Sequence, residues 1–234
     1  MKKALCLLTI ITCMRFALAC FAFSDDEIMN IETKATQGDA EAQFDLGLLY
    51  EYGRGVKQDS RKAREWFEKA AYQEVALAQN SLGQLYENGR GVTQNYIKAM
   101  EWYGKAASQG VAQAQYNLGS FFYRGQGIKQ DYVRAKMLFE EAAVQGFAQA
   151  QYNLGHIYYY GQGVKQDKVR AKEWFEKAAK QGYEDAQFNL GLMYHNGLGV
   201  KKDLNIAKEW YEQSCNNGFQ KGCDAYKELN NKKF

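Results

Sequence analysis

The stretch FAQAQYNLGHIYYYGQGVKQDKVRAKEWFEKAAKQG, residues 147–182, decides the fold because its pattern recurs at a fixed spacing along the chain. The residues that recur most regularly are an Ala-Gln pair, a Leu-Gly pair and a Gly-x-Gly motif. The Ala-Gln pairs begin at Ala42, Ala78, Ala114, Ala150 and Ala186, and the Gly-x-Gly motifs begin at Gly53, Gly89, Gly125, Gly161 and Gly197. A strict period of this size indicates supersecondary units that stack on their neighbours.

The first half of residues 147–182 predicts an amphipathic helix that ends at a glycine. Ala150, Leu154 and Ile157 recur at the spacing of one helix face. Gly161 follows the last apolar turn, where a left-handed residue commonly ends a helix. Gly163 then lets the chain reverse, so each repeat turns back on itself.

The second half predicts another helix, antiparallel to the first. Asp167 is a good N-cap, and its counterparts are Asp59, Asn95, Asp131 and Asp203. Ala171, Trp174 and Phe175 follow at helical spacing, and Gly182 ends the unit. Neither helix can bury its apolar face alone, so we expect stacking of neighbours to stabilise the chain.

These letters resemble the Sel1-like repeat, a longer relative of the tetratricopeptide repeat. The resemblance implies an all-α, right-handed α-solenoid of antiparallel helix pairs, and such arrays serve as interaction scaffolds. The expected organisation is a signal peptide at 1–22, an N-terminal capping helix at 23–38, five repeats across 39–218 (39–74, 75–110, 111–146, 147–182 and 183–218), and a C-terminal capping helix and tail at 219–234.

One repeat departs from the pattern at its end. Glu74 stands where other units have glycine. A glutamate at positive φ costs about 1 kcal/mol, so this junction is either strained or turns differently.

The N-terminus reads as a secretory signal peptide. Lys2 and Lys3 precede the apolar run 4–14, and small residues follow at 17–22. Cleavage after Ala19 or after Ala22 fits, and a minor alternative is a lipid anchor on Cys20. We therefore expect an exported protein, periplasmic or secreted, with no integral membrane segment in the mature chain.

The charge argues against a nucleic-acid partner. The chain has 30 Lys and Arg against 27 Asp and Glu, and Lys2, Lys3 and Arg15 lie in the expected signal peptide. Their removal leaves 30 − 3 = 27 basic residues against 27 acidic ones, so the mature chain carries no net charge.

Export changes the interpretation of the cysteines. Cys215 and Cys223 remain in the mature chain, where two antiparallel helices meet across a short turn. In an oxidising compartment we expect a disulfide, ahead of a metal or redox pair. The surrounding letters resemble the cysteine-rich branch of the Sel1-like family, some members of which have been linked to penicillin binding or β-lactamase-like activity. A penicillin-binding or β-lactamase-like protein is therefore an alternative.

Motifs for catalysis or cofactors are missing from the sequence. It has no Ser-x-x-Lys, no His-Glu-x-x-His and no phosphate-binding Gly-x-x-x-x-Gly-Lys. The Gly-x-Gly motifs follow helices instead of strands, which favours turns over nucleotide binding. We expect no enzyme activity, no catalytic residue, no cofactor and no metal.

The first helices of the repeats carry the expected binding surface. In related tetratricopeptide arrays these helices line a concave face, and aromatic residues there suit a protein or peptide partner, or an envelope glycan as an alternative. The predicted partner-binding residues are Tyr116, Tyr123, Arg124, Tyr152, His156, Tyr159, Tyr160, Phe188 and His195. For Tyr152 and its equivalents, packing between helices is an equally good interpretation.

Overall fold

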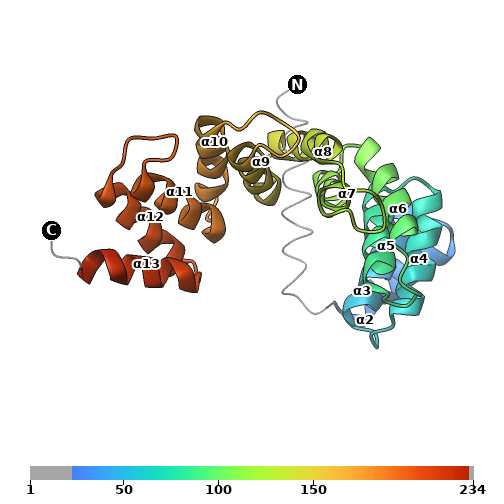
Figure 1. Ribbon diagram of the computed structural model, residues 1–234. Helices are drawn as coiled ribbons and strands as arrows, with labels where there is room; N and C mark the ends of the chain where they lie inside the picture. Colours follow the sequence, from blue (N-terminus) through green and yellow to red (C-terminus); the bar gives the residue numbers. More distant parts are fainter. Residues whose placement is uncertain (1–22, 232–234) are drawn as a thin grey trace, which may run out of the picture. The chain divides into compact units, whose positions relative to one another are not determined.

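The computed structural model describes residues 23–231, and every regular element in this range is an α-helix (Figure 1). The expected all-α fold of packed helix pairs is confirmed. The helices are α2 Asp25–Thr36, α3 Ala40–Tyr52, α4 Ser60–Tyr72, α5 Ala76–Asn88, α6 Tyr96–Ser108, α7 Ala112–Arg124, α8 Tyr132–Val144, α9 Ala148–Tyr160, α10 Lys168–Ala179, α11 Glu184–Asn196, α12 Leu204–Asn216 and α13 Gln220–Asn231.

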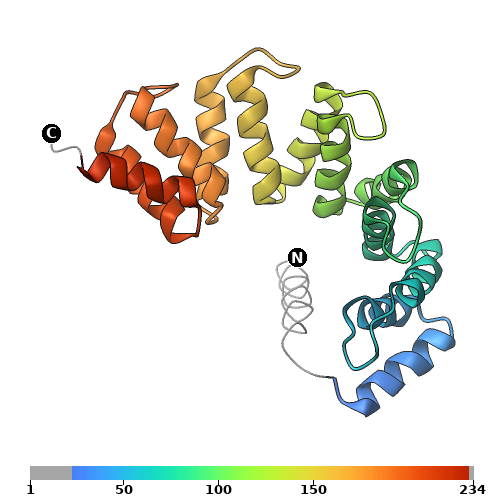
Figure 2. The same cartoon turned by 60° about the horizontal axis from the view of Figure 1, so that its bottom comes forward.

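The helices form two compact units that divide between Gln94 and Asn95. Unit 1 contains α2 to α5, and unit 2 contains α6 to α13. Within each unit every helix packs against the next one along the chain. In unit 2 the long loops after α7, α9 and α11 lie at the same end of their helix pairs (Figure 2).

The turn chemistry follows the expected pattern. α9 ends at Gly161, whose φ of 71° is left-handed, and its N–H bonds to the Ile157 carbonyl. α10 begins after Asp167, whose carboxylate accepts a hydrogen bond from the Arg170 N–H. Glycine is suited to position 161 because a residue with a side chain is strained at positive φ.

Glu74 adopts the conformation that glycine has in the other repeats. Its φ is 64°, and it is the one non-glycine residue with positive φ in the described part of the chain. The strained alternative is therefore the one that the structure shows.

The close approach of the two helices in a repeat depends on the glycine of the Leu-Gly pair. In repeat 147–182 a Cβ on Gly155 would overlap the ring of Phe175, which is almost completely buried. Gly47 faces Phe67 in the same way in unit 1. The recurring glycine thus makes room for the recurring aromatic residue.

The glutamine of each Ala-Gln pair links neighbouring repeats. Gln151 is 5% exposed, donates to the Ala143 carbonyl at 3.0 Å and accepts from Gln181 at 2.8 Å. A buried amide must be hydrogen-bonded, and these partners come from α8 of the preceding repeat and from the turn after α10. The recurrence of this glutamine is therefore structural.

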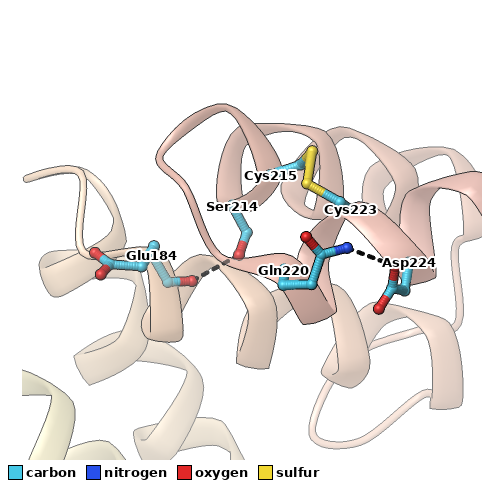
Figure 3. Close-up of a disulfide and its surroundings, with 6 residues drawn as sticks. All are labelled: Glu184, Ser214, Cys215, Gln220, Cys223 and Asp224. Atoms are coloured by element: carbon cyan, nitrogen blue, oxygen red, sulfur yellow. Dashed lines mark hydrogen bonds between the residues drawn. A yellow bond between two sulfur atoms is a disulfide. The ribbon is translucent and has the colours of Figure 1, made fainter.

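The two ends of the described chain are held differently. α2 begins with a capping box, in which Ser24 and Glu27 bond to each other's backbone N–H. At the other end, the sulfur atoms of Cys215 and Cys223 lie 1.98 Å apart, at disulfide distance, and join α12 to α13 (Figure 3). Beside them, Ser214 donates to the Glu184 carbonyl at 2.9 Å.

The expected signal peptide at 1–22, with Cys20, lies outside the described residues. Across residues 23–231, no helix has both the length and the apolar character needed to cross a membrane.

Candidate functional site

A small pocket lies where α9, α10 and α11 meet in unit 2. Its volume is about 60 Å³. The lining residues are His156, Tyr159 and Tyr160 from α9, Phe175 from α10, and Asn189 and Leu192 from α11. Three of the predicted partner-binding residues therefore share one pocket.

His156 is the centre of this aromatic group. Its ring stacks on Tyr160 with centroids 5.7 Å apart and planes 15° from parallel. Tyr152 meets it edge-on at 4.6 Å, and Phe175 does so at 5.4 Å. Three aromatic rings thus surround the imidazole.

The imidazole is also held by the neighbouring repeat. The Asn189 amide lies 3.2 Å from His156 Nε2, with Nδ2 as the atom that can donate. Asn189 also hydrogen-bonds the Tyr152 side chain. Burial lowers the pKa of His156, because a charged ring would lose hydration in this site. The lowered pKa favours the uncharged ring, in which Nε2 can accept from the Asn189 amide when the ring proton is on Nδ1.

Tyr159 and Tyr160 form the outer rim. Their rings lie 4.9 Å apart at a steep angle, and Tyr160 is 59% exposed. Lys168 Nζ lies 5.6 Å from the centre of the Tyr159 ring. An exposed aromatic beside a pocket offers contact area to another molecule at a low entropic cost.

Three other predicted residues pack between helices. Tyr116 lies 5.1 Å from Phe147, Tyr152 lies 5.0 Å from Tyr183, and Phe188 lies 5.3 Å from Phe219, all as ring centroids. Burial raises the pKa of Tyr152 first, and the charge of Asp185 adds to the shift. This geometry favours the packing interpretation of this column, and partner binding by it stays a prediction.

The remaining predicted residues lie apart from the pocket lining. Tyr123 is half-buried and donates to Gln162 Oε1 at 2.9 Å. Arg124 is exposed at the end of α7. His195 Nδ1 lies 3.4 Å from the hydroxyl of Tyr211, whose pKa burial raises to about 12.

Sequence reasoning missed Asn189 and Gln162. Asn189 precedes a Leu-Gly pair, as Asn117 and Asn153 do, and this column could have been noticed as polar between apolar neighbours. Gln162 is the middle residue of a Gly-x-Gly, a position that varies from repeat to repeat. Its role depends on contact with another repeat, which the local pattern does not reveal.

No cluster of three or more His, Cys, Asp and Glu side chains with metal-binding geometry occurs between residues 23 and 231. Both histidines of the chain lie in this range, each hydrogen-bonded to an uncharged side chain.

Comparison with known proteins gives the family. The model of the Sel1 repeat matches residues 40–75, 76–111, 112–147, 148–183 and 184–219. A search of curated proteins returned no match.

Among solved structures, a Sel1 repeat protein from Oxalobacter formigenes is 32% identical with a TM-score of 0.83, over 92% of this chain and 85% of that one. The protective antigen c5321 of uropathogenic Escherichia coli is 30% identical with a TM-score of 0.55, over 87% of this chain but 51% of that one. A Sel1 repeat protein of Klebsiella pneumoniae is 26% identical with a TM-score of 0.55, over 86% and 98%. With five matched repeats and helix pairs packed in series, this chain belongs to the Sel1 repeat family.

Proposed function

We propose that this chain is a non-catalytic scaffold that binds a protein partner through the α9–α11 face, defined as the pocket lining together with the exposed ring of Tyr160. The observation that carries the proposal is an exposed aromatic rim beside a formed pocket on a repeat scaffold. Repeat arrays of helix pairs offer such extended surfaces to partners, and aromatic residues dominate binding energy at interfaces.

The scaffold supplies an internal control for this proposal. Tyr52 in unit 1 occupies the same repeat position as Tyr160 and is 54% exposed, against 59% for Tyr160. Tyr52 does not line the α9–α11 pocket. A partner that recognises the α9–α11 face should therefore depend on Tyr160 and ignore Tyr52.

The experiment is site-specific photo-crosslinking in the native host. A photoreactive phenylalanine analogue at position 160 should give a discrete adduct, whose partner is identified by mass spectrometry and then produced in pure form. The purified partner should bind the wild type and Tyr52→Ala equally, and bind Tyr160→Ala at least tenfold more weakly. Equal binding by all three proteins would show that the α9–α11 face is not the interface.

We also propose that the protein is exported. The N-terminal sequence pattern and the cysteine pair at disulfide distance support this proposal, because disulfides persist in oxidising compartments. The intact mass of the protein from the envelope or culture fraction should correspond to cleavage after Ala19 or Ala22. A full-length chain confined to the cytosol would contradict it.

A further inference from the structure

A second cavity of unit 2 is formed by the loop that joins α9 to α10 and by the helices beside it, and we call it the loop cavity. Its volume is about 630 Å³, which is within the range of small-molecule sites. Its walls come from α8, from the last turn of α9, from the loop and from the first turn of α10. Among the described residues, none lines both this cavity and the α9–α11 pocket.

The charged side chains that line the loop cavity are mostly basic. The lining holds one acid, Asp167, and four bases, which are Lys136, Lys165, Lys168 and Arg170. Four bases less one acid give a net charge of +3. Glu140 lies outside the lining and pairs with Lys136 at 2.9 Å, which lowers the local charge to +2. Such an excess of positive charge in a cavity attracts an anion.

The remaining charges on the neighbouring helices cancel one another. α9 contains no Asp, Glu, Lys or Arg. On α8, Arg134 is balanced by Glu141. On α10, beyond the lining, two bases balance two acids, and these residues are Lys172, Lys177, Glu173 and Glu176. The positive charge of the loop cavity is therefore not offset by the helices that form it.

The preceding repeat forms a cavity at the same place with different walls. Its volume is about 660 Å³. The two cavities share three charged positions, occupied in the preceding repeat by Lys129, Asp131 and Arg134. Met100, however, stands at the position of Lys136. Tyr132 stands at the position of Lys168. The shared charges belong to the repeat, and the two additional lysines distinguish the loop cavity.

The cations of the loop cavity are available to a ligand. Within residues 23–231, neither Lys165 nor Lys168 has an acidic partner. Lys168 Nζ lies 5.6 Å from the centre of the Tyr159 ring. Arg170 pairs with Asp167 at 3.5 Å, but its side chain is 63% exposed. Because an exposed ion pair is weak, Arg170 can turn towards a ligand at small cost.

We propose that the loop cavity binds the phosphate group of a phosphorylated small molecule. A phosphate monoester carries about −1.5 to −2 charges at neutral pH, which matches the local charge of +2 better than a single carboxylate does. Its oxygens accept charge-assisted hydrogen bonds from several directions, and the cations come from α8, the loop and α10.

The size of the cavity indicates that the phosphate is carried on an organic body. One water needs roughly 10–15 Å³ of such space, so about 630 Å³ is far more than the four oxygens of a phosphate ion occupy. The site shares no lining residue with the α9–α11 pocket, so this inference is independent of the proposed function.

The test is a titration of the isotope-labelled full chain, followed by its backbone amide signals at constant ionic strength. The probes are glycerol phosphate, glycerate and glycerol. Glycerol phosphate should shift the amides of residues 165–170 saturably and leave those of residues 129–134, in the preceding cavity, in place. Glycerate, which has a carboxylate instead of the phosphate, should bind about tenfold more weakly, and glycerol should not bind.

Two double variants separate the cavity from a general effect of charge. Lys136→Met with Lys168→Tyr copies the residues of the preceding repeat and should weaken binding of glycerol phosphate about tenfold. Lys172→Met with Lys177→Gln removes the same charge outside the lining and should leave binding unchanged. Thermal midpoints check that both proteins fold. If the first does not fold, Lys165→Gln in the exposed loop replaces it and should weaken binding about threefold.

The outcomes that would overturn the inference are distinct. No saturable shift, equal shifts in both cavities, or an equal loss in the control variant would overturn the site. Equal binding of glycerate would overturn the assignment to phosphate, and inorganic phosphate that binds as tightly as glycerol phosphate would overturn the organic body. Phosphatidylglycerol vesicles that bind the chain while glycerol phosphate does not would assign the cations to a lipid surface instead of the cavity. None of these results depends on the crosslink at position 160, so the proposed function is judged separately.

Discussion

The same junction between repeats is built from an ion pair in unit 1 and from a neutral hydrogen bond in unit 2. In unit 1, Glu51 of one repeat meets Arg90 of the next, with Oε1 and Nη1 2.5 Å apart. In unit 2, Tyr123 meets Gln162 at 2.9 Å. In each pair, the first residue is the second-last residue of a repeat's first helix. Its partner is the middle residue of the Gly-x-Gly in the next repeat, 39 positions later. The same two repeat positions therefore hold an ion pair in unit 1 and a neutral hydrogen bond in unit 2.

The next junction in unit 2 is apolar. Tyr159 and Leu198 occupy the corresponding positions, and both pack against the same hydrophobic cluster. The three junctions pair like with like: charge with charge, polar with polar, and apolar with apolar. The comparison indicates that the recurring residues specify the fold of each repeat, while the variable residues make the contacts that are particular to its neighbour.

The largest expected effect concerns the end of unit 2. Replacing Cys215 and Cys223 by alanine removes a link that closes 8 residues, which should lower the free energy of unfolding by about 2.5 kcal/mol. Chemical denaturation of oxidised protein and of the double variant measures it. Hydrogen exchange should show the loss in α12 and α13, with α3 and α4 of unit 1 unchanged. Uniform loss across both units would contradict a local effect.

The ion pair of unit 1 gives the next effect. Glu51 is 4% exposed, and neither of its oxygens has a hydrogen bond of good geometry, so Arg90 is its charge partner. Arg90→Gln should therefore destabilise the protein by about 2 kcal/mol. The double variant Glu51→Tyr with Arg90→Gln copies the pair from unit 2 and should recover at least half of the loss. Denaturant midpoints decide it, and equal loss in both variants would refute the pairing rule.

The matching change in unit 2 should be smaller. Gln162→Leu removes the acceptor of a half-buried tyrosine hydroxyl, which should cost about 1 kcal/mol because Tyr123 carries no charge. The same denaturation series measures it. A loss as large as that of Arg90→Gln would erase the distinction between the two junctions.

The left-handed residue after α4 gives a stabilising change. Glu74→Gly should remove about 1 kcal/mol of backbone strain and return about 0.5 kcal/mol as unfolded-chain entropy, for a net gain of about 0.5 kcal/mol. The control is Gly146→Ala in unit 2, where φ is 90° and a Cβ has open space. That variant should be destabilised, as read from the thermal midpoint. A gain in both would show that φ is not the cause.

The smallest effect is the pH dependence that His156 contributes to the stability of unit 2. The folded state lowers the pKa of His156 by burial, so below about 6.5 the unfolded chain binds more protons than the folded one. Stability should be greatest above about pH 6.5 and should fall as the pH drops towards the folded pKa. His156→Gln should flatten this slope in denaturation curves, and an unchanged slope would mean that His156 is not the group responsible.

Much of the fold was predictable because the same sequence pattern occurs in five repeats. The N-cap at Asp167, the left-handed Gly161 and the burial of Phe175 follow from spacing and local chemistry. Residues in one repeat interact with near neighbours in sequence, and these interactions have periodic signatures. The Sel1-like resemblance carried the same information and is confirmed by the family match.

The candidate site was predictable only in part. His156, Tyr159 and Tyr160 stood out because they break the repeat, and they do share a pocket. Tyr116 and Phe188 belong to the column of Tyr152, for which packing between helices was an equally good interpretation, and their rings lie against core rings. A varying aromatic can fit a neighbour or face solvent, and spacing within one helix does not distinguish the two.

The sequence by itself determined the helices, their caps and the order in which they pack, because those features arise from interactions within or between adjacent segments. The tertiary structure decided which varying residues meet: His156 with Asn189, Tyr123 with Gln162, and Glu51 with Arg90. These contacts join residues more than thirty positions apart. They depend on the rotation of one repeat against the next, and that rotation is set by the packing of the whole interface.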